Sequence, residues 1–365
     1  MKPEKGILHI VWQMDIGGAE RAVYQLVREQ NRNFINADIL IINQKGFYGA
    51  KCELICNNVY SLNANNFPNS EIRNRFKNIC RKYDKVHFHS VEFVYMILIS
   101  KLKDIEKYYT HRAGIHNFTL KKRIRHKIAG YYLRKYFKKI SANTFLGAKA
   151  ASKIFKIPLE EICVTYNGID FELLKEEIDR NLLKKDLGIE GEIIIGSSAN
   201  IRIWKRLDKI VYLMNKLKNN NVKAIIVGDG PCKSELIKLA EELNLKDRII
   251  FIDKTNNIAD YLQIMDIFIL PSDNSESFGN SAVEALGWGI PTFVYSDGGG
   301  LTEHIINNET GFIVKSDEEL LEKVKLLIND KNLRDKIGEN GRHHVRSKYN
   351  LTKMISNYNK FYDIE

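Results

Sequence analysis

Residues 267–284 read IFILPSDNSESFGNSAVE, a stretch that combines an apolar run, a polar loop and a helix start. The run Ile267–Leu270 is apolar throughout rather than alternating, which fits a parallel strand covered on both faces. Asn280 and Ser281 are favourable N-cap residues, so we expect a helix to begin there. Strand, loop and helix in this order predict an α/β unit whose loop lies at the carboxyl end of the sheet.

The same alternation of apolar runs and longer helical segments recurs along the chain. The runs fall at residues 7–12, 37–42, 85–88, 107–110, 139–142 and 163–166, and then at 193–197, 223–227, 249–252, 267–270, 292–294 and 311–314. Strands that alternate with helices predict parallel sheets joined by right-handed crossovers. Two series of about six strands therefore predict two doubly wound, Rossmann-like α/β domains.

The break between the two domains is expected in the charged segment 170–192, which has no strand pattern. We place an N-terminal domain at residues 1–175 and a C-terminal domain at residues 190–345. An amphipathic helix at residues 346–365 is expected to pack back on the N-terminal domain. A length of 365 residues fits two domains of ordinary size.

Composition and charge narrow the class of protein. A hydrophobic content of 44% with 28% charged residues is typical of a soluble globular protein, and the net charge of +11 suggests an anionic partner. The five cysteines form no CxxC pair, which favours reduced thiols in a cytosolic protein. The first residues have no signal-peptide pattern, and no run of about 18 apolar residues predicts a membrane span.

Two glutamates, Glu276 and Glu284, flank the predicted helix start with no Lys or Arg between them. We expect Glu284 in the first helical turn, where its oxygens could accept hydrogen bonds from the hydroxyls of a ribose. Glu276, in the loop, could do the same for a sugar. The alternative is structural: Glu284 complements the helix dipole, worth about 0.3–1 kcal/mol, and Glu276 is solvated. The residues alone leave both interpretations open.

Three other loops follow predicted strands. DIGGAER, at 15–21, places Gly17 and Gly18 where the backbone can approach an anion closely, although it lacks the GxGxxG pattern and a plain turn is an equal alternative. SSANIRIWKR, at 197–206, contains two basic residues that could bind a phosphate. The Arg202 guanidinium can donate two parallel hydrogen bonds to phosphate oxygens, and the Lys205 ammonium can supply a compact positive charge. The alternative for residues 197–206 is a basic loop that is only solvated. The third loop, VGDGP at 227–231, is interpreted as a structural turn.

Taken together, these motifs resemble those of the retaining GT-B glycosyltransferases of family four. The stretch ESFGNSAVEALGWGIP, with seven residues between Glu276 and Glu284, is similar to the signature of that family. GGAE at 17–20, YNGID at 166–170, ANIRIWKRLD at 199–208, VGDGP at 227–231 and SDGGGLTEHI at 296–305 occur in the family's order. The resemblance covers residues 7–345. It implies a GT-B fold, with two Rossmann-like domains facing a cleft, and transfer of a sugar from a UDP- or GDP-sugar to a hydroxyl with retention of configuration.

The resemblance also implies roles for particular residues. Glu284 would bind the ribose, Glu276 the transferred sugar, and Lys205 with a basic partner the diphosphate. The remaining donor contacts would come from the Gly17–Gly18 backbone of the other domain and from the backbone near Phe278, Gly279, Asn280 and Ser281.

Two positions depart from the family pattern. Asn200 stands where the family often has an arginine, so Arg202 is expected to substitute for it. His111 resembles the histidine that faces the sugar, but Arg112 follows it where a small residue is commoner, and a structural histidine is an equal alternative. His87 and His89 are expected to be packed or hydrogen-bonded.

No DxD pair lies in a donor loop, since Asp15 and Asp273 stand apart, so we predict an enzyme without a metal or other cofactor. Lys205, Arg202 and helix N-termini would stabilise the leaving diphosphate instead. The alternatives are a GT-B nucleotide-sugar epimerase and a non-catalytic sugar-nucleotide-binding partner. A nicotinamide oxidoreductase is disfavoured by the missing fingerprint. The resemblance implies a saccharide or lipid-linked acceptor in surface polysaccharide, lipopolysaccharide or glycolipid assembly.

The most basic stretch of the chain is KKRIRHKIAGYYLRKYFKK, at residues 121–139, with nine Lys or Arg and no acidic residue. A basic helix with an apolar stripe can lie on an anionic membrane, so we predict such a surface as a partner. The alternative is a solvated helix whose apolar face packs into its own domain. No nucleic-acid-binding module accompanies the charge, so no nucleic acid partner is expected. We expect a cytoplasmic protein that is peripheral on the inner face of the plasma membrane.

Overall fold

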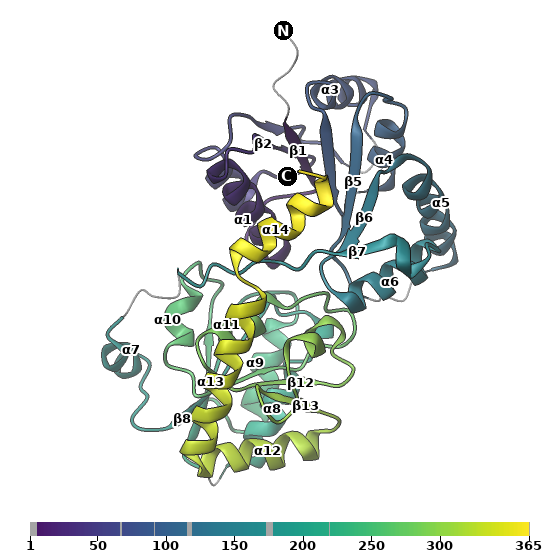
Figure 1. The fold of residues 1–365 in the computed structure, drawn as a ribbon. Helices are drawn as coiled ribbons and strands as arrows, with labels where there is room; N and C mark the ends of the chain where they lie inside the picture. The colour runs from purple at the N-terminus through teal and green to yellow at the C-terminus, as the bar shows by residue number, and fades with distance from the viewer. Residues whose placement is uncertain are drawn as a thin grey trace. The chain divides into compact units, whose positions relative to one another are not determined.

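The computed structural model describes residues 6–65, 68–90, 92–114, 119–172, 178–218 and 220–364, which form two compact units (Figure 1). The first unit comprises Met1–Gly168 and Leu351–Glu365, and the second comprises Ile169–Asn350. Ile169, the first residue of the second unit, bridges to Asn350, the last residue of that unit, and donates its N–H to the carbonyl of Tyr349 at 2.7 Å.

The first unit is built on a seven-stranded parallel sheet in the order β3-β2-β1-β4-β5-β6-β7. Its strands are β1 (Ile7–Val11), β2 (Ala37–Ile41), β3 (Val59–Ser61), β4 (Lys85–His89), β5 (Glu106–His111), β6 (Lys139–Ala142) and β7 (Ile162–Val164). Its helices are α1 (Gly18–Arg32), α2 (Gly46–Cys52), α3 (Ser70–Cys80), α4 (Phe93–Ser100), α5 (Leu120–Tyr136), α6 (Phe145–Phe155) and α14 (Leu351–Tyr362), with a 3₁₀ turn η1 (Leu159–Glu161).

The two faces of this sheet differ in chemistry because neighbouring residues of a strand point to opposite sides. One face carries apolar side chains such as Leu8, Val86 and Phe88, which belong to the largest hydrophobic cluster of the unit. The other face carries His9 and Thr110 among its buried polar groups. Helices α1 and α14 pack together in this unit, and their apolar residues share one cluster with β1 and β5 (Figure 1).

The second unit is built on a six-stranded parallel sheet in the order β10-β9-β8-β11-β12-β13. Its strands are β8 (Ile193–Ser198), β9 (Val222–Val227), β10 (Ile249–Ile252), β11 (Ile267–Leu270), β12 (Thr292–Tyr295) and β13 (Phe312–Val314). Its helices are α7 (Arg180–Asp186), α8 (Asp208–Lys216), α9 (Lys233–Glu242), α10 (Ile258–Leu262), α11 (Asn280–Gly287), α12 (Asp317–Asn329) and α13 (Lys331–Lys348), with 3₁₀ turns η3 (Ile203–Lys205) and η4 (Gly299–His304).

The predicted α/β class with two doubly wound parallel sheets is confirmed. In each sheet, the first three strands of the chain run from the centre to one edge, and the later strands run from the centre to the other edge. The strand order therefore reverses between β1 and β4 in the first unit and between β8 and β11 in the second. Ligands of open α/β sheets bind at such reversals, outside the carboxyl ends of the strands. Within the described ranges, no helix is both long and apolar enough to cross a membrane.

Candidate functional site

In the second unit, the loops at the reversal between β8 and β11 bring Lys205 and Glu276 into contact. Lys205 closes the turn η3 that follows β8, and Glu276 lies in the loop between β11 and α11. The Lys205 Nζ forms an ion pair with the Glu276 Oε2, and the two side chains are only 13% and 14% exposed. The Ser272 hydroxyl lies 3.4 Å from the same carboxylate oxygen.

The sequence around Glu276 predicts a carboxylate without a basic partner, and this contact corrects that prediction. The neighbouring sequence contains no cation, but the fold supplies one from a position 71 residues earlier in the chain. An ammonium and a carboxylate therefore lie together at the point where an open α/β sheet binds its ligand.

Arg206, which the sequence analysis did not single out, fixes the loops around this pair. Its guanidinium donates to the carbonyls of Pro271 at 2.6 Å and Ser272 at 2.9 Å, and it forms a forked pair with Asp297 at 2.7 and 2.8 Å. The hydrogen bond from Arg206 holds the pKa of the Asp297 carboxyl below its ordinary value. One side chain thus joins the loops that follow β8, β11 and β12. The sequence does show an acidic residue, Asp297, shortly after the run at 292–294. Its pairing with Arg206 could be predicted only if the order of the strands in the sheet were known.

Arg202 makes its contacts within its own loop. It is exposed, its Nε donates to the Asn200 Oδ1 at 3.3 Å, and its guanidinium lies 5.2 Å from the centre of the Trp204 ring. Arg202 and Asn200 therefore lie in the predicted loop and bond to each other, and within the described part of the chain no hydrogen bond or ion pair joins the side chain of either residue to that of Lys205 or Glu276.

The loop at Gly228–Pro231 packs closely against the Asn200 loop. Gly230 has a φ of 155°, and a Cβ there would lie 2.4 Å from the carbonyl oxygen of Ile201. The Ile201 N–H also donates to the Asp229 carbonyl at 2.8 Å. The glycine permits this close approach of two backbone segments, so the loop supports the site.

The helix α11 begins one residue earlier than its predicted cap implied. Gly279 is the N-cap, with φ at 76°, and Asn280 is the first helical residue, so a cap at Asn280 or Ser281 is wrong. A Cβ on Gly279 would lie 2.2 Å from the Leu301 Cδ2, so both backbone angle and space require glycine. The first-turn N–H groups of α11 lie at the carboxyl end of β11, where a helix terminus favours an anion.

Phe278 and Glu284 are both buried on this helix-and-loop segment. The Phe278 ring packs 4.5 Å from the ring of His304, and its carbonyl oxygen accepts a hydrogen bond from the His304 Nε2 at 2.6 Å. Burial lowers the pKa of His304 to about 3, so the imidazole is neutral. The side chain of Phe278 therefore belongs to the core of the unit.

Glu284 is the fifth residue of α11 and lies in the second helical turn, not in the first as predicted. The helix dipole acts mainly within the terminal turn, so the position no longer favours the dipole interpretation. Its side chain is 3% exposed, so a carboxylate is held inside the unit next to the loop that carries Glu276.

In the first unit, Gly17, Gly18 and His111 lie at the carboxyl edge of the other sheet. Gly17 is the N-cap of α1 in an extended conformation, and Gly18 is exposed as the first helical residue. His111 ends β5, is 5% exposed, and meets the Phe155 ring edge-on with ring centres 5.5 Å apart. Strand β4 lies between β1 and β5, so the glycines and the histidine occupy separate parts of this edge.

Among the described residues, His9, His87 and His89 form a cluster that could hold a metal ion, with ligand atoms within 4.8 Å of one another. The hydrogen bonds argue against this use. The Arg112 Nε donates to the His89 Nδ1 at 3.1 Å, so the proton of a neutral His89 sits on Nε2, which lies 2.9 Å from the His9 Nδ1. His9 then donates from Nε2 to the Gln30 Oε1 at 2.7 Å. Both ring nitrogens of His87 are also engaged, at 2.6 Å from the Tyr362 hydroxyl and 2.7 Å from the Thr110 hydroxyl, so the lone pairs that a metal needs are already occupied.

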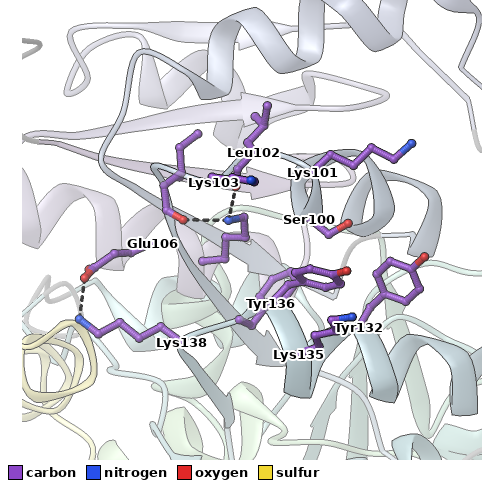
Figure 2. A pocket seen from close by; sticks show the side chains of 12 residues that line it. Ser100, Lys101, Leu102, Lys103, Glu106, Tyr132, Lys135, Tyr136 and Lys138 are labelled. Atoms are coloured by element: carbon purple, nitrogen blue, oxygen red, sulfur yellow. Dashed lines mark hydrogen bonds and ion pairs between the residues drawn. The ribbon is translucent and has the colours of Figure 1, made fainter.

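The first unit also has a surface hollow of about 730 Å³. It is lined by residues 100–103, 105–107, 132 and 135–138, and the last five of these belong to the basic stretch 121–139 that was predicted to meet a membrane surface (Figure 2). Glu106 begins β5, and Lys138 directly precedes β6. The hollow therefore lies at the amino-terminal edge of the sheet, opposite the edge at which ligands of such sheets bind.

Comparison with known proteins finds similarity to glycosyltransferases over part of the chain. Residues 179–344 match the family model for glycosyl transferases group 1. The chain is 31% identical over 209 residues to N-acetyl-alpha-D-glucosaminyl L-malate synthase of Bacillus anthracis, covering 56% of this chain and 54% of that protein. It is 28% identical over 210 residues to the capsular polysaccharide biosynthesis glycosyltransferase CapM of Staphylococcus aureus, covering 53% of each. The matched segments span about half the length of these curated relatives.

Solved structures share the whole architecture at low sequence identity. Anabaena HepE, in complex with UDP and glucose, superposes with a TM-score of 0.86 at 19% identity, covering 99% of this chain and 100% of that one. A glycosyltransferase from Rickettsia africae superposes with a TM-score of 0.83 at 21% identity, covering 99% and 98%. The chain therefore has the GT-B fold, and its residues 179–344 are similar to the glycosyl transferases group 1.

Proposed function

We propose that this chain is a retaining glycosyltransferase that moves a sugar from a UDP- or GDP-sugar to a hydroxyl group. The observation that carries the proposal is the Lys205–Glu276 pair beside the N-terminus of α11. An ammonium group suits a diphosphate, and a carboxylate suits sugar hydroxyls, so the pair is complementary to the two halves of a nucleotide sugar. The binding of UDP and glucose by HepE, which shares the fold, supports a donor of this kind.

In the absence of donor, Lys205 and Glu276 satisfy each other in a largely buried setting, which avoids leaving either charge unpaired. When a donor enters, the Lys205 ammonium turns to the diphosphate, and the Glu276 carboxylate accepts hydrogen bonds from the sugar. Glu284 accepts those of the ribose. The ion pair is thus exchanged for two contacts to one ligand.

The chemical step breaks the bond between the anomeric carbon and the diphosphate oxygen, and the bonding electrons leave with the diphosphate. The acceptor oxygen bonds to the anomeric carbon on the same face, and its proton passes to the leaving phosphate oxygen. No protein nucleophile is proposed. Lys205, the α11 N-terminus and Arg202 after a side-chain rotation stabilise the developing charge, so we propose that no metal is needed.

For the acceptor, we propose a saccharide or lipid-linked molecule in surface polysaccharide, lipopolysaccharide or glycolipid assembly. CapM is named for capsular polysaccharide biosynthesis, and a second relative, from Escherichia coli, is named for O-antigen biosynthesis. These names support the class of acceptor and leave the individual molecule to experiment.

The test is a panel of UDP- and GDP-sugars, first in thermal unfolding and then in turnover. A donor at 100 times its dissociation constant should stabilise the protein by about 2.7 kcal/mol. Transfer to an added saccharide or lipid-linked acceptor supports the proposal. An epimerised donor in the absence of acceptor would show an epimerase, and binding without turnover of any donor would show a non-catalytic partner.

A further inference from the structure

The 3₁₀ turn η4, which follows β12, holds the loop that carries Glu276 and leads into α11. The Gly300 N–H donates to the Glu276 carbonyl at 3.1 Å. The Leu301 side chain fills the space beside Gly279, where an added Cβ would lie 2.2 Å from the Leu301 Cδ2. The backbone of this loop is therefore fixed on the side that faces η4.

His304 ends the turn and makes a third contact with the loop. Its side chain is fully buried, and its Nε2 donates to the Phe278 carbonyl at 2.6 Å. Burial lowers the pKa of His304 to about 3, so the imidazole is neutral and carries one proton. Because a carbonyl can only accept, that proton lies on Nε2. The Nδ1 is then an acceptor, and no hydrogen bond to it is recorded among the described residues.

The unmatched Nδ1 is a cost that packing alone does not explain, because a buried acceptor without a donor destabilises the folded state. The rings of Phe278 and Tyr349 lie against the imidazole, with ring centres 4.5 and 4.9 Å from its own. A leucine could fill this apolar site without the unmatched nitrogen. What a leucine could not supply is the hydrogen bond to the Phe278 carbonyl.

That hydrogen bond sets the direction of the next N–H group along the chain. The Phe278 carbonyl and the Gly279 N–H belong to one planar trans peptide, in which the two groups point in opposite directions. Because the carbonyl points toward the buried His304, the Gly279 N–H points to the other side of the loop. Gly279 is the N-cap of α11, and the Glu276 Cγ would lie 3.5 Å from a Cβ added to Gly279. The N–H therefore lies beside both the carboxylate and the helix terminus of the proposed donor site.

We propose that His304 is a positioning residue for the nucleotide-sugar donor, which aims the Gly279 N–H at an oxygen of the transferred sugar or of the phosphate that carries it. His304 acts through the peptide between Phe278 and Gly279, because its own side chain is buried behind the loop. The inference rests on the proposed function and adds to it a residue for which the sequence predicted no role.

The experiment is calorimetry of nucleotide binding by the full chain and by variants at His304. The probes are UMP, UDP and the UDP-sugar that stabilises the protein most in the panel above, or the three guanosine equivalents. His304→Leu should weaken binding of the nucleotide sugar about tenfold, because one hydrogen bond to the donor is lost, and should change the affinity for UMP less than about twofold. A loss that is already present with UDP assigns the N–H to the phosphate, and a loss confined to the UDP-sugar assigns it to the sugar.

Two further substitutions separate the hydrogen bond from the packing. His304→Gln keeps an N–H donor at a reach similar to that of Nε2 and should restore the affinity for the nucleotide sugar to within about threefold of the wild-type value. The amide of His304→Asn is too short to reach the Phe278 carbonyl, so this variant should behave like His304→Leu and replaces it if the leucine variant does not fold. Thermal unfolding without nucleotide checks that each variant is folded.

Tyr349→Phe is the matched control. It removes the hydrogen bond from the Tyr349 hydroxyl to the Glu303 carbonyl, at 3.2 Å, beside the same imidazole, and leaves the Phe278 carbonyl bonded. It should bind all three probes like the wild-type protein. A tenfold loss that UMP shares, or a glutamine variant as weak as the leucine variant, would show a general distortion of the loop and overturn the proposal.

The outcome also separates this inference from the proposed function. Wild-type binding of the nucleotide sugar with unchanged affinity in His304→Leu and His304→Asn would remove the role of His304 alone. A wild-type protein that binds none of the probes would overturn the proposed function, and this inference with it.

Discussion

Lys205 and Glu276 could each be predicted as site residues from the sequence, but their contact could not. Both side chains could be selected from the sequence, because each follows an apolar run that predicts a strand. Their direct contact could not, since it depends on β8 and β11 being neighbours while β9 and β10 intervene in the chain. Arg206 was missed for the same reason: its partners follow two other strands.

Lys205→Ala should lower kcat/KM by about 10²–10³-fold, because a positioned cation at the leaving diphosphate is lost. Stability should fall by about 1–3 kcal/mol, because Glu276 loses its partner. Initial rates with saturating acceptor and urea unfolding measure the two effects. Lys233→Ala, which also removes a lysine from an ion pair in the same unit, is the control and should leave the rate unchanged. Unchanged turnover in Lys205→Ala would contradict the diphosphate role.

Replacing each glutamate by glutamine should affect different steps, nucleotide binding for Glu284 and sugar transfer for Glu276. Glu284→Gln should raise the dissociation constant of the nucleotide, because a ribose hydroxyl loses a charged acceptor. Glu276→Gln should slow transfer more than it weakens folding, because the carboxylate acts on the transferred sugar. Calorimetry with UDP or GDP and rates with the whole donor distinguish the two. If Glu276→Gln changed stability alone, the carboxylate would be only a structural partner of Lys205.

Among the elements, strands were predictable where their residues form an apolar run, even at an edge of the sheet, and were missed where they do not. Ile267–Leu270 and Ile249–Ile252 match the predicted runs. Strand β3 (Val59–Ser61) was missed because its residues are only partly buried at the sheet edge and form no apolar run. The start of α11 was predicted one residue late, because side-chain capping rules favour Asn and Ser, whereas this turn uses the left-handed freedom of Gly279.

Replacing that glycine tests the α11 terminus as an element of the site. Gly279→Ala should cost about 1 kcal/mol or more of stability, because an L residue resists a φ of 76° and the new methyl meets Leu301. Donor affinity should fall as well, since the first-turn N–H groups shift. Gly191→Ala is the matched control, with a φ of 84° but nothing within 4 Å of the added carbon. It should lose stability without losing donor affinity, and equal affinity losses in both variants would contradict a role for this terminus.

Across the whole molecule, the last helix belongs to the first unit, and buried polar groups hold it there. The His87 Nδ1 lies 2.6 Å from the Tyr362 hydroxyl, and Arg112 donates to the Tyr358 hydroxyl at 2.9 Å. The same Arg112 begins the chain of hydrogen bonds through His89 to His9. Sequence periodicity predicted an amphipathic helix here, but not this network, because its members lie on separate strands and a helix more than 200 residues away in the chain.

These histidines should make the first unit more sensitive to acid than the second. Burial holds the pKa of His9 at about 3 and the pKa values of His87 and His89 well below 6.5, with Arg112 lowering them further. In the unfolded chain each titrates near 6.5, so below that pH the unfolded state binds more protons. Stability should therefore be intact above pH 6.5 and fall as the pH drops toward 3, by about 1.4 kcal/mol per pH unit for each histidine. In the second unit, His304 is the fully buried counterpart, with a pKa lowered to about 3.

The tryptophans allow the units to be followed separately, because Trp12 lies in the first and Trp204 and Trp288 lie in the second. Urea unfolding of Trp204→Phe/Trp288→Phe reports the first unit, and that of Trp12→Phe reports the second. Between pH 7 and pH 5 the first unit should lose clearly more stability than the second. His89→Gln should reduce that loss, since one titrating group is gone, even though it lowers stability at pH 7 by breaking the chain to His9. Parallel losses in the two units, or a pH dependence unchanged in His89→Gln, would mean that the buried histidines do not control the acid response.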